Sequence, residues 1–288
     1  MQILKIAVFA AVLSGLCFFP GSAQDMEVFL LSLPDGIPGP APQEHDERLV
    51  NHPAGGPELF KFLHETAAPS IPDSGDAYLK AKKYMFSVAD NAGCAGSPGV
   101  MEFYSKVCVP GSSQYGSDYR ENGDQNGDGV VDSEGMNAEH SWPQGFFNQE
   151  HPMRADLHHV FPTFMTINNV RGSAPFAMVS KPWYSTSNGT GRGYEGFEPA
   201  DSIKGDIARA MLYFVLIYYD RNIRDGADYD YFWKNRVRMF LEWNRFDPPD
   251  AAEKRRNDLI AGYQGNRNPF VDDFTLPDRI GAEVFMSH

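Results

Sequence analysis

The chain has 288 residues, and its 38 acidic residues outnumber its 25 basic ones, which gives a formal net charge of −13. This balance argues against a protein that coats nucleic acid by charge alone, since such proteins are usually basic. It does not exclude an enzyme that meets phosphate groups through a metal ion and a local basic patch.

The first residues are typical of a secretory signal peptide. Lys5 supplies a positive charge, an apolar run follows over residues 6–19, and small residues at 21–23 allow cleavage. The run is shorter than the roughly 20 residues of a membrane span. We therefore expect residues 1–23 to be a signal peptide, the mature protein to be secreted or periplasmic, and no membrane partner.

The remaining chain divides into an arm and one domain. Proline and glycine are abundant in residues 24–74, which predicts an extended N-terminal arm with a short helix near Pro57–Glu65. From residue 75 to 288, strand signals are few and short. Apolar spacing and capping residues predict helices at residues 77–89, 201–220, 229–243 and 250–264. The sequence thus predicts a mostly helical α+β domain with a small antiparallel sheet.

Two cysteines, Cys94 and Cys108, remain after the signal peptide. An even pair in an exported protein favours a disulfide. The bridge would close a loop of about 15 residues and stabilise the fold by about 3 kcal/mol. The alternative is two buried thiols.

The acidic segment at residues 124–134 matches the first part of a calcium-binding loop motif. Oxygen-bearing residues alternate, and Gly129 stands at the sixth position, where a sharp turn is needed. Gly135 occupies the twelfth position, so the final acid of an EF-hand is out of place. We expect a structural Ca²⁺ site here, with a solvated acidic turn as the alternative. Its ligands would be Asp124, Asn126, Asp128, the Val130 carbonyl, Asp132 and Glu134.

Metal-binding and proton-transferring side chains concentrate in the next segment. It holds Glu139 and half of the eight histidines of the chain, namely His140, His151, His158 and His159. The spacing fits no zinc signature. One carboxylate with an amide and water ligands suits a hard cation such as Mg²⁺.

Three segments in this order, Glu139–Phe147, Asp156–Pro162 and Asn168–Gly172, resemble the bacterial endonuclease I family. These are secreted or periplasmic nucleases of the His-Me finger (ββα-metal) superfamily. The resemblance continues through segments at 204–210, 242–243, 256–260 and 264–270, and therefore covers roughly residues 75–273. It implies a domain built around a ββα-metal motif.

The resemblance also implies roles for the central residues. His140 would be the general base that activates water. Glu139 and Asn168 would hold one catalytic Mg²⁺, with Mn²⁺ or Ca²⁺ as substitutes. An arginine would bind the phosphate, and the sequence does not choose between Arg154 and Arg171.

Further residues would orient this site without touching the reacting atoms. Asp156, His158 and Asn169 are the residues that the resemblance places in this supporting role. Lys204, Arg209 and Arg267-Asn268 have two open interpretations: they line a nucleic-acid groove, or they supply helix-surface charge and a C-terminal packing turn.

The activity that the resemblance implies is nonspecific endonucleolytic cleavage of DNA, with RNA open as a second substrate, by a monomer that leaves 5′-phosphate products. An alternative from a different class of protein remains: a non-catalytic calcium-binding secreted or surface protein on the same scaffold. Among enzymes, a metal phosphatase or phospholipase is the rival.

One geometric difficulty follows from strand geometry. Adjacent residues of a strand face opposite sides of the sheet, yet Glu139 and His140 both have to reach the phosphate. We expect a bulge or a strand end at this point.

Overall fold

The structure, a computed structural model, describes residues 55–72, 74–119 and 135–288. All of these residues belong to one compact unit that spans residues 38–288. The proposed signal peptide, most of the N-terminal arm and the proposed calcium ligands at 124–134 lie outside the described residues. Within the part of the chain that is described, no helix combines the length and apolarity needed to cross a bilayer.

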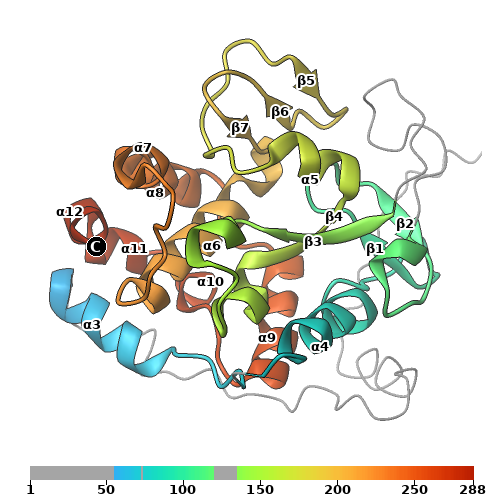
Figure 1. The fold of residues 1–288 in the computed structure, drawn as a ribbon, viewed down its shortest axis with the longest axis horizontal. Coiled ribbons are helices and arrows are strands. Elements are labelled where there is room, and N and C mark those ends of the chain that lie inside the picture. The colour runs from blue at the N-terminus through green and yellow to red at the C-terminus, as the bar shows by residue number, and fades with distance from the viewer. Residues whose placement is uncertain (1–54, 73, 120–134) are drawn as a thin grey trace, which may run out of the picture. The chain divides into compact units, whose positions relative to one another are not determined.

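Two antiparallel strands and a helix form the part of the fold that carries the predicted site (Figure 1). Strand β3 (Met136–His140) pairs with β4 (Val160–Phe164), and helix α5 (Met165–Arg171) follows β4 directly. The register runs without interruption from Met136↔Phe164 to His140↔Val160. The strand–strand–helix order agrees with the ββα motif that the resemblance implies.

Helix α6 (Lys204–Tyr218) is the centre of the helical core. Every residue in it except Asp206 is buried, so it is covered on all sides and not along one apolar face only. Helix α8 (Val237–Phe246) packs against α6, and α9 (Ala251–Gln264) packs against the short 3₁₀ helix at Leu157–His159. The core therefore ties α6 and α9 to the segment that leads into β4.

Six further α-helices are described. They are α3 (Gly56–Thr66), α4 (Ala77–Tyr84, continued by a π-helical turn at Met85–Ala89), α7 (Tyr229–Phe232), α10 (Pro269–Asp272), α11 (Leu276–Ile280) and α12 (Ala282–Ser287). Helix α3 falls in the segment assigned to the arm, and it packs on α11 and α6 through Leu59, Phe60 and Leu63. The described fold is an α+β fold, as the sequence predicts.

The prediction of one helix over residues 229–243 is wrong. The segment breaks at Trp233, whose φ of −117° and ψ of −66° separate α7 from a 3₁₀ turn and α8. The fully buried Trp233 indole stacks on Phe240 and donates from Nε1 to the Phe285 carbonyl over 3.2 Å. Packing of this large side chain overrides the local helical periodicity.

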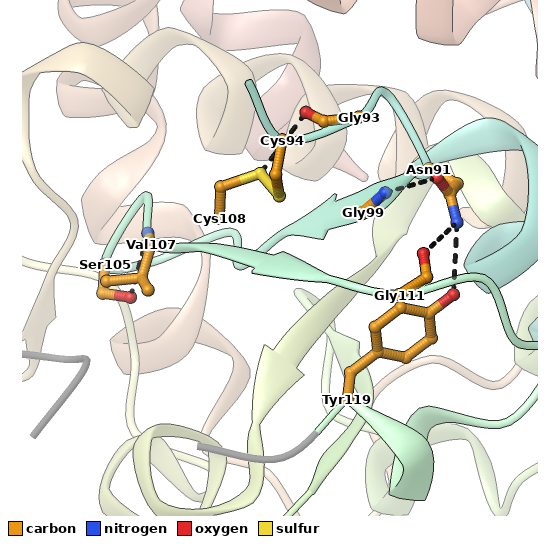
Figure 2. The surroundings of a disulfide bond; sticks show 9 residues. All are labelled: Asn91, Gly93, Cys94, Gly99, Ser105, Val107, Cys108, Gly111 and Tyr119. Carbon is orange, nitrogen blue, oxygen red and sulfur yellow. Dashed lines mark hydrogen bonds between the residues drawn. A yellow bond between two sulfur atoms is a disulfide. The ribbon is translucent and has the colours of Figure 1, made fainter. Parts of the chain in front are cut away.

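The predicted disulfide between Cys94 and Cys108 is present, with the two Cα atoms 5.7 Å apart (Figure 2). It joins the turn before strand β1 (Gly99–Met101) to the first residue of its partner β2 (Cys108–Pro110). Position 99 has to be glycine because a Cβ there would lie 2.3 Å from the Cys94 sulfur.

A third small sheet lies beyond α5 and consists of β5 (Tyr184–Ser185), β6 (Gly191–Arg192) and β7 (Phe197–Glu198) (Figure 1). The Tyr104 carbonyl accepts hydrogen bonds from Asn188 Nδ2 over 2.8 Å and from Thr190 Oγ1 over 2.7 Å. These bonds attach the β5–β6 connection to the loop between β1 and β2.

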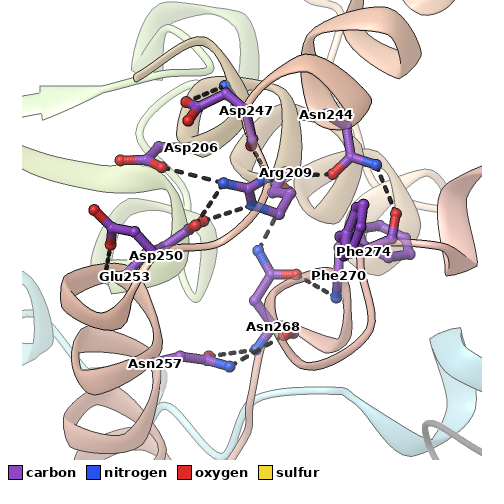
Figure 3. Close-up of polar contacts among 11 residues, drawn as sticks. Asp206, Arg209, Asn244, Asp247, Asp250, Glu253, Asn257, Asn268, Phe270 and Phe274 are labelled. Atoms are coloured by element: carbon purple, nitrogen blue, oxygen red, sulfur yellow. Dashed lines mark hydrogen bonds and ion pairs between the residues drawn. The ribbon is translucent and has the colours of Figure 1, made fainter. Parts of the chain in front are cut away.

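Arg209 is the centre of a buried ionic network that joins α6, α8 and α9 (Figure 3). Its Nε donates to Glu253 over 2.7 Å, and Nη1 donates to the Asp247 carbonyl over 2.7 Å. Lys204, Arg267 and Asn268 are also buried, and both cations are ion-paired. The interpretation of these residues as the lining of a nucleic-acid groove is therefore wrong, and they stabilise the packing of the helices.

Replacing Arg209 with alanine should lower the free energy of unfolding by about 3–5 kcal/mol, because the buried Glu253 carboxylate would lose its cation. Urea unfolding followed by circular dichroism measures this change. Arg238→Ala is the matched control, since Arg238 also pairs with a glutamate, Glu283, but at 68% and 79% side-chain exposure. That control should change stability by less than about 1 kcal/mol. Equal losses in the two variants would contradict the structural role of Arg209.

Candidate active site

Strand alternation separates the predicted site residues onto two faces of the β3–β4 pair. Glu139 contacts Tyr104 and Arg171, whereas His140 contacts the turn that contains Arg154. No bulge interrupts β3, and His140 is its last residue. Of the two expected solutions, the structure contains the strand end.

Arg171 contacts the end of β3 through one side chain and two backbone carbonyls. Its Nη1 lies 3.0 Å from Oε1 of Glu139 and donates to the His140 carbonyl over 2.9 Å. Its Nη2 donates to the Ser141 carbonyl over 2.6 Å. The Arg171 and Glu139 side chains are 1% and 2% exposed. The guanidinium is thus committed to the protein and fixes α5 against the end of β3.

The Glu139 carboxylate is held by a second donor, the Tyr104 hydroxyl, over 2.8 Å to Oε1. Burial raises the pKa of Glu139 above its usual range, and Arg171 and Tyr104 oppose this shift only in part. A cation beside the carboxylate would favour its charged form.

Asn168 stands on α5 above the face of β3 that carries Glu139. Its Nδ2 donates to Oδ1 of Asn137 over 2.6 Å, and Asn137 precedes Glu139 by two residues on the same face. With the nitrogen committed to Asn137, the amide oxygen is the atom that can bind a cation. A carboxylate and an amide oxygen are ligands of the type that Mg²⁺ prefers.

No group of three His, Cys, Asp or Glu side chains among the described residues could hold a metal ion. A cation at this site would depend on Glu139, Asn168 and water, which is the set that the resemblance implies.

His140 is buried and oriented by a backbone carbonyl. Its Nε2 lies 3.0 Å from the Arg154 carbonyl oxygen, which can only accept, so Nε2 carries the hydrogen and Nδ1 keeps the lone pair. Burial, with smaller contributions from His159 and the nearby arginines, lowers the pKa of His140 to about 3. The imidazole is therefore neutral near pH 7, the state in which Nδ1 can accept a proton.

The side chain of Arg154 differs from that of Arg171. Within the described residues, its guanidinium has no hydrogen bond and no ion pair, and Cζ lies 4.4 Å from the centroid of the Tyr78 ring. The Tyr78 ring is in turn 5.6 Å from the His140 ring. Arg154 is thus the arginine beside His140 that remains available for an anion.

The supporting residues lie in different environments. The fully buried Asp156 accepts from the hydroxyls of Tyr213 and Tyr218 over 2.8 and 2.7 Å, which ties the segment before β4 to α6. His158 Nε2 donates to the Asn266 carbonyl over 2.9 Å. Asn169 is exposed on α5. Asp156 and His158 thus anchor the backbone that carries His159 and β4.

Three contacting residues did not emerge from the sequence. Asn137 could have been found, because alternation along the strand places it on the face of Glu139. Tyr104 and Tyr78 had no local signal, since Tyr104 reaches Glu139 from 35 residues away and Tyr78 belongs to another helix. Only the tertiary fold brings these rings to the site.

The comparison with known families agrees with this architecture. The family model for endonuclease I matches residues 59–274. The chain therefore belongs to the endonuclease I family.

Individual relatives are nucleases with different substrates. The chain is 33% identical over 172 residues to an extracellular ribonuclease of Bacillus amyloliquefaciens, with 54% of this chain and 56% of the relative covered. It is 34% identical over 169 residues to an extracellular ribonuclease of Bacillus subtilis, with the same coverage. A periplasmic deoxyribonuclease of Aeromonas hydrophila is 29% identical over 128 residues, 42% of this chain and 48% of the relative. The chain thus spans about half the length of the curated relatives it matches.

Replacing Arg171 and replacing Arg154 should change the free energy of unfolding by different amounts. Arg171→Met leaves the buried Glu139 carboxylate without its cation and should lower the free energy of unfolding by about 3–5 kcal/mol. Arg154→Met removes one cation–π contact and should change it by about 1 kcal/mol or less. Chemical unfolding of both variants in metal-free buffer measures the difference. A loss of equal size for Arg154→Met would show that its guanidinium is also committed to the fold.

Proposed function

We propose that this protein is a secreted, metal-dependent endonuclease that hydrolyses phosphodiester bonds. The observation that carries the proposal is the presence of a neutral, oriented His140 beside the Arg154 guanidinium, which has no ion pair among the described residues, at the end of a ββα motif. Phosphodiester hydrolysis can use a base that accepts a proton and a cation that binds the anionic substrate. Membership of the endonuclease I family supports the same reaction.

Each residue has a proposed role. His140 Nδ1 removes the proton of the attacking water, and the Arg154 carbonyl keeps the imidazole in the required tautomer. The Arg154 guanidinium binds the phosphate that is cut. Arg171 holds Glu139 and the end of β3 in place and does not touch the substrate. This assignment chooses between the two arginines that the sequence left open.

Glu139 and Asn168 would hold the metal ion, with Mg²⁺ as the expected species and Mn²⁺ or Ca²⁺ as substitutes. The ion would neutralise charge that develops on the phosphate and leaving oxygens. Asp156, His158 and Asn169 remain proposed supporting residues. The bonds of Asp156 and His158 to α6 and to Asn266 agree with such a role.

The substrate is proposed to be DNA, RNA or both, cut without sequence preference by a monomer that leaves 5′-phosphate ends. The names of the relatives support both polymers, since they include ribonucleases and deoxyribonucleases. They also support action outside the cytoplasm, because these relatives are called extracellular or periplasmic. Residues 1–23 would then be the export signal.

Removing the proposed base tests the mechanism. We expect purified protein to cut plasmid DNA or RNA with Mg²⁺ and to lose activity in EDTA. His140→Ala should lower the cleavage rate by about 100- to 10,000-fold, since the proton acceptor is gone. Initial rates on both polymers, measured in parallel on gels, provide the readout.

His64→Ala is the control, because His64 also binds a backbone carbonyl, that of Leu216, but lies on α3. It should cleave at the wild-type rate. Near-normal cleavage by a folded His140→Ala protein would remove the assignment of the base. Failure of the wild-type protein to cut either polymer with Mg²⁺, Mn²⁺ or Ca²⁺ would overturn the proposed function.

A further inference from the structure

Helix α4 presents cations without acidic partners beside the candidate site. Lys82 and Lys83 have no ion pair within the described residues, although the chain carries a net charge of −13. Lys80 on the same helix does have a partner, since its Nζ lies 2.7 Å from Asp76. Unpaired cations in an acidic protein point to an anionic ligand.

Tyr78 connects Lys82 to the site. The Lys82 Nζ lies 4.7 Å from the centroid of the Tyr78 ring, and the Arg154 Cζ lies 4.4 Å from the same centroid. The ring is 5.6 Å from the ring of His140. Two cations that repel each other are therefore held against one ring, next to the proposed base.

The helix explains this arrangement. Tyr78 and Lys82 are four residues apart and therefore neighbours on one face of α4. The buried Ala77 and Ala81 face the protein, and α4 packs against the 3₁₀ helix Met153–Ala155, which carries Arg154. A cation–π contact stabilises each cation by about 0.5–1 kcal/mol, but it leaves the positive charge uncompensated.

We propose that Lys82 and Tyr78 form a second phosphate-binding site, which takes the nucleic-acid phosphate next to the one bound by Arg154. Tyr78 is the positioning residue that holds both cations at this spacing. The inference rests on the proposed function and extends it, because it assigns the path that the bound nucleic-acid strand takes from His140 across α4. Successive phosphates carry one charge each, so two cations on one ring, neither with an ion pair among the described residues, can meet two neighbouring phosphates.

The test measures binding without cleavage. A short fluorescein-labelled oligonucleotide is titrated with the full-length mature protein in EDTA, and anisotropy gives the binding constant over a series of NaCl concentrations. Lys82→Ala should weaken binding on every sequence and reduce the slope of log K against log[salt] by about one, as loss of one phosphate contact does.

Two control variants separate the proposal from a general charge effect. Lys80→Ala removes the same charge from the same helix, but this lysine is paired with Asp76, so the slope should stay at the wild-type value. Tyr78→Phe keeps the ring and should bind like wild type. Tyr78→Leu should bind the oligonucleotide more weakly and show a smaller slope of log K against log[salt]. Thermal unfolding of each variant checks that the fold is retained.

The outcomes distinguish this site from the proposed reaction. An unchanged slope for Lys82→Ala, equal effects of Lys80→Ala and Lys82→Ala, or no binding by the wild-type protein at low salt would each overturn the phosphate site. Binding that depends on Lys82 in a protein that cleaves nothing would support the site and refute the nuclease.

Discussion

The buried ion pair of Arg171 with Glu139 is the interaction on which the site depends. Arg171 is the last residue of α5, and its guanidinium reaches the carboxylate of Glu139 and the carbonyls of His140 and Ser141. It therefore fixes the helix that carries Asn168 relative to the strand that carries Glu139. Removing one partner of such a pair is costly because the other stays buried and charged. The same contact sets the relative position of the proposed metal ligands and the proposed base.

Pairing sorts the basic residues of this acidic protein into two groups. Arg171, Arg209 and Arg267 are buried and bonded to carboxylates, so their charges are used to hold elements together. Arg154 and Lys82 contact an aromatic ring and have no ion pair within the described residues. Only the second group can gain substantially from a phosphate, because the first would have to give up a protein carboxylate. Burial and pairing, more than the number of cations, therefore decide where an acidic nuclease would bind nucleic acid.

The sequence predicted the fold where local signals and packing agree. The apolar spacing of residues 201–220 and the capping aspartate Asp250 correspond to α6 and α9, and Asp250 does accept from the Glu253 amide. The single helix expected over residues 229–243 failed because the Trp233 indole is drawn into the core, which no local pattern reveals. The disulfide followed from the count of cysteines and the expected export signal.

The site was less accessible to sequence reasoning. Only the resemblance indicated that Glu139, His140 and Asn168 share one site. The pairing of β3 with β4 and the turn into α5 belong to the tertiary structure, which local sequence patterns do not reveal. The choice between Arg154 and Arg171 needed their hydrogen-bond partners. Tyr78 and Tyr104 were missed, since an aromatic residue far away in sequence shows no sign that its ring supports a guanidinium or a carboxylate.

Arg154 links the two halves of the proposed chemistry through different atoms. Its carbonyl accepts the Nε2 hydrogen of His140, which fixes the tautomer of the base, and its side chain points to the Tyr78 ring and is available for the phosphate. A shift of the short helix at Met153–Ala155 would therefore displace His140 and the Arg154 guanidinium together. A change of the side chain alone leaves the carbonyl in place, so the orientation of His140 is independent of the residue type at position 154. The backbone of this helix, anchored through Asp156 to α6, thus determines the spacing between the proposed proton acceptor and the proposed phosphate-binding cation.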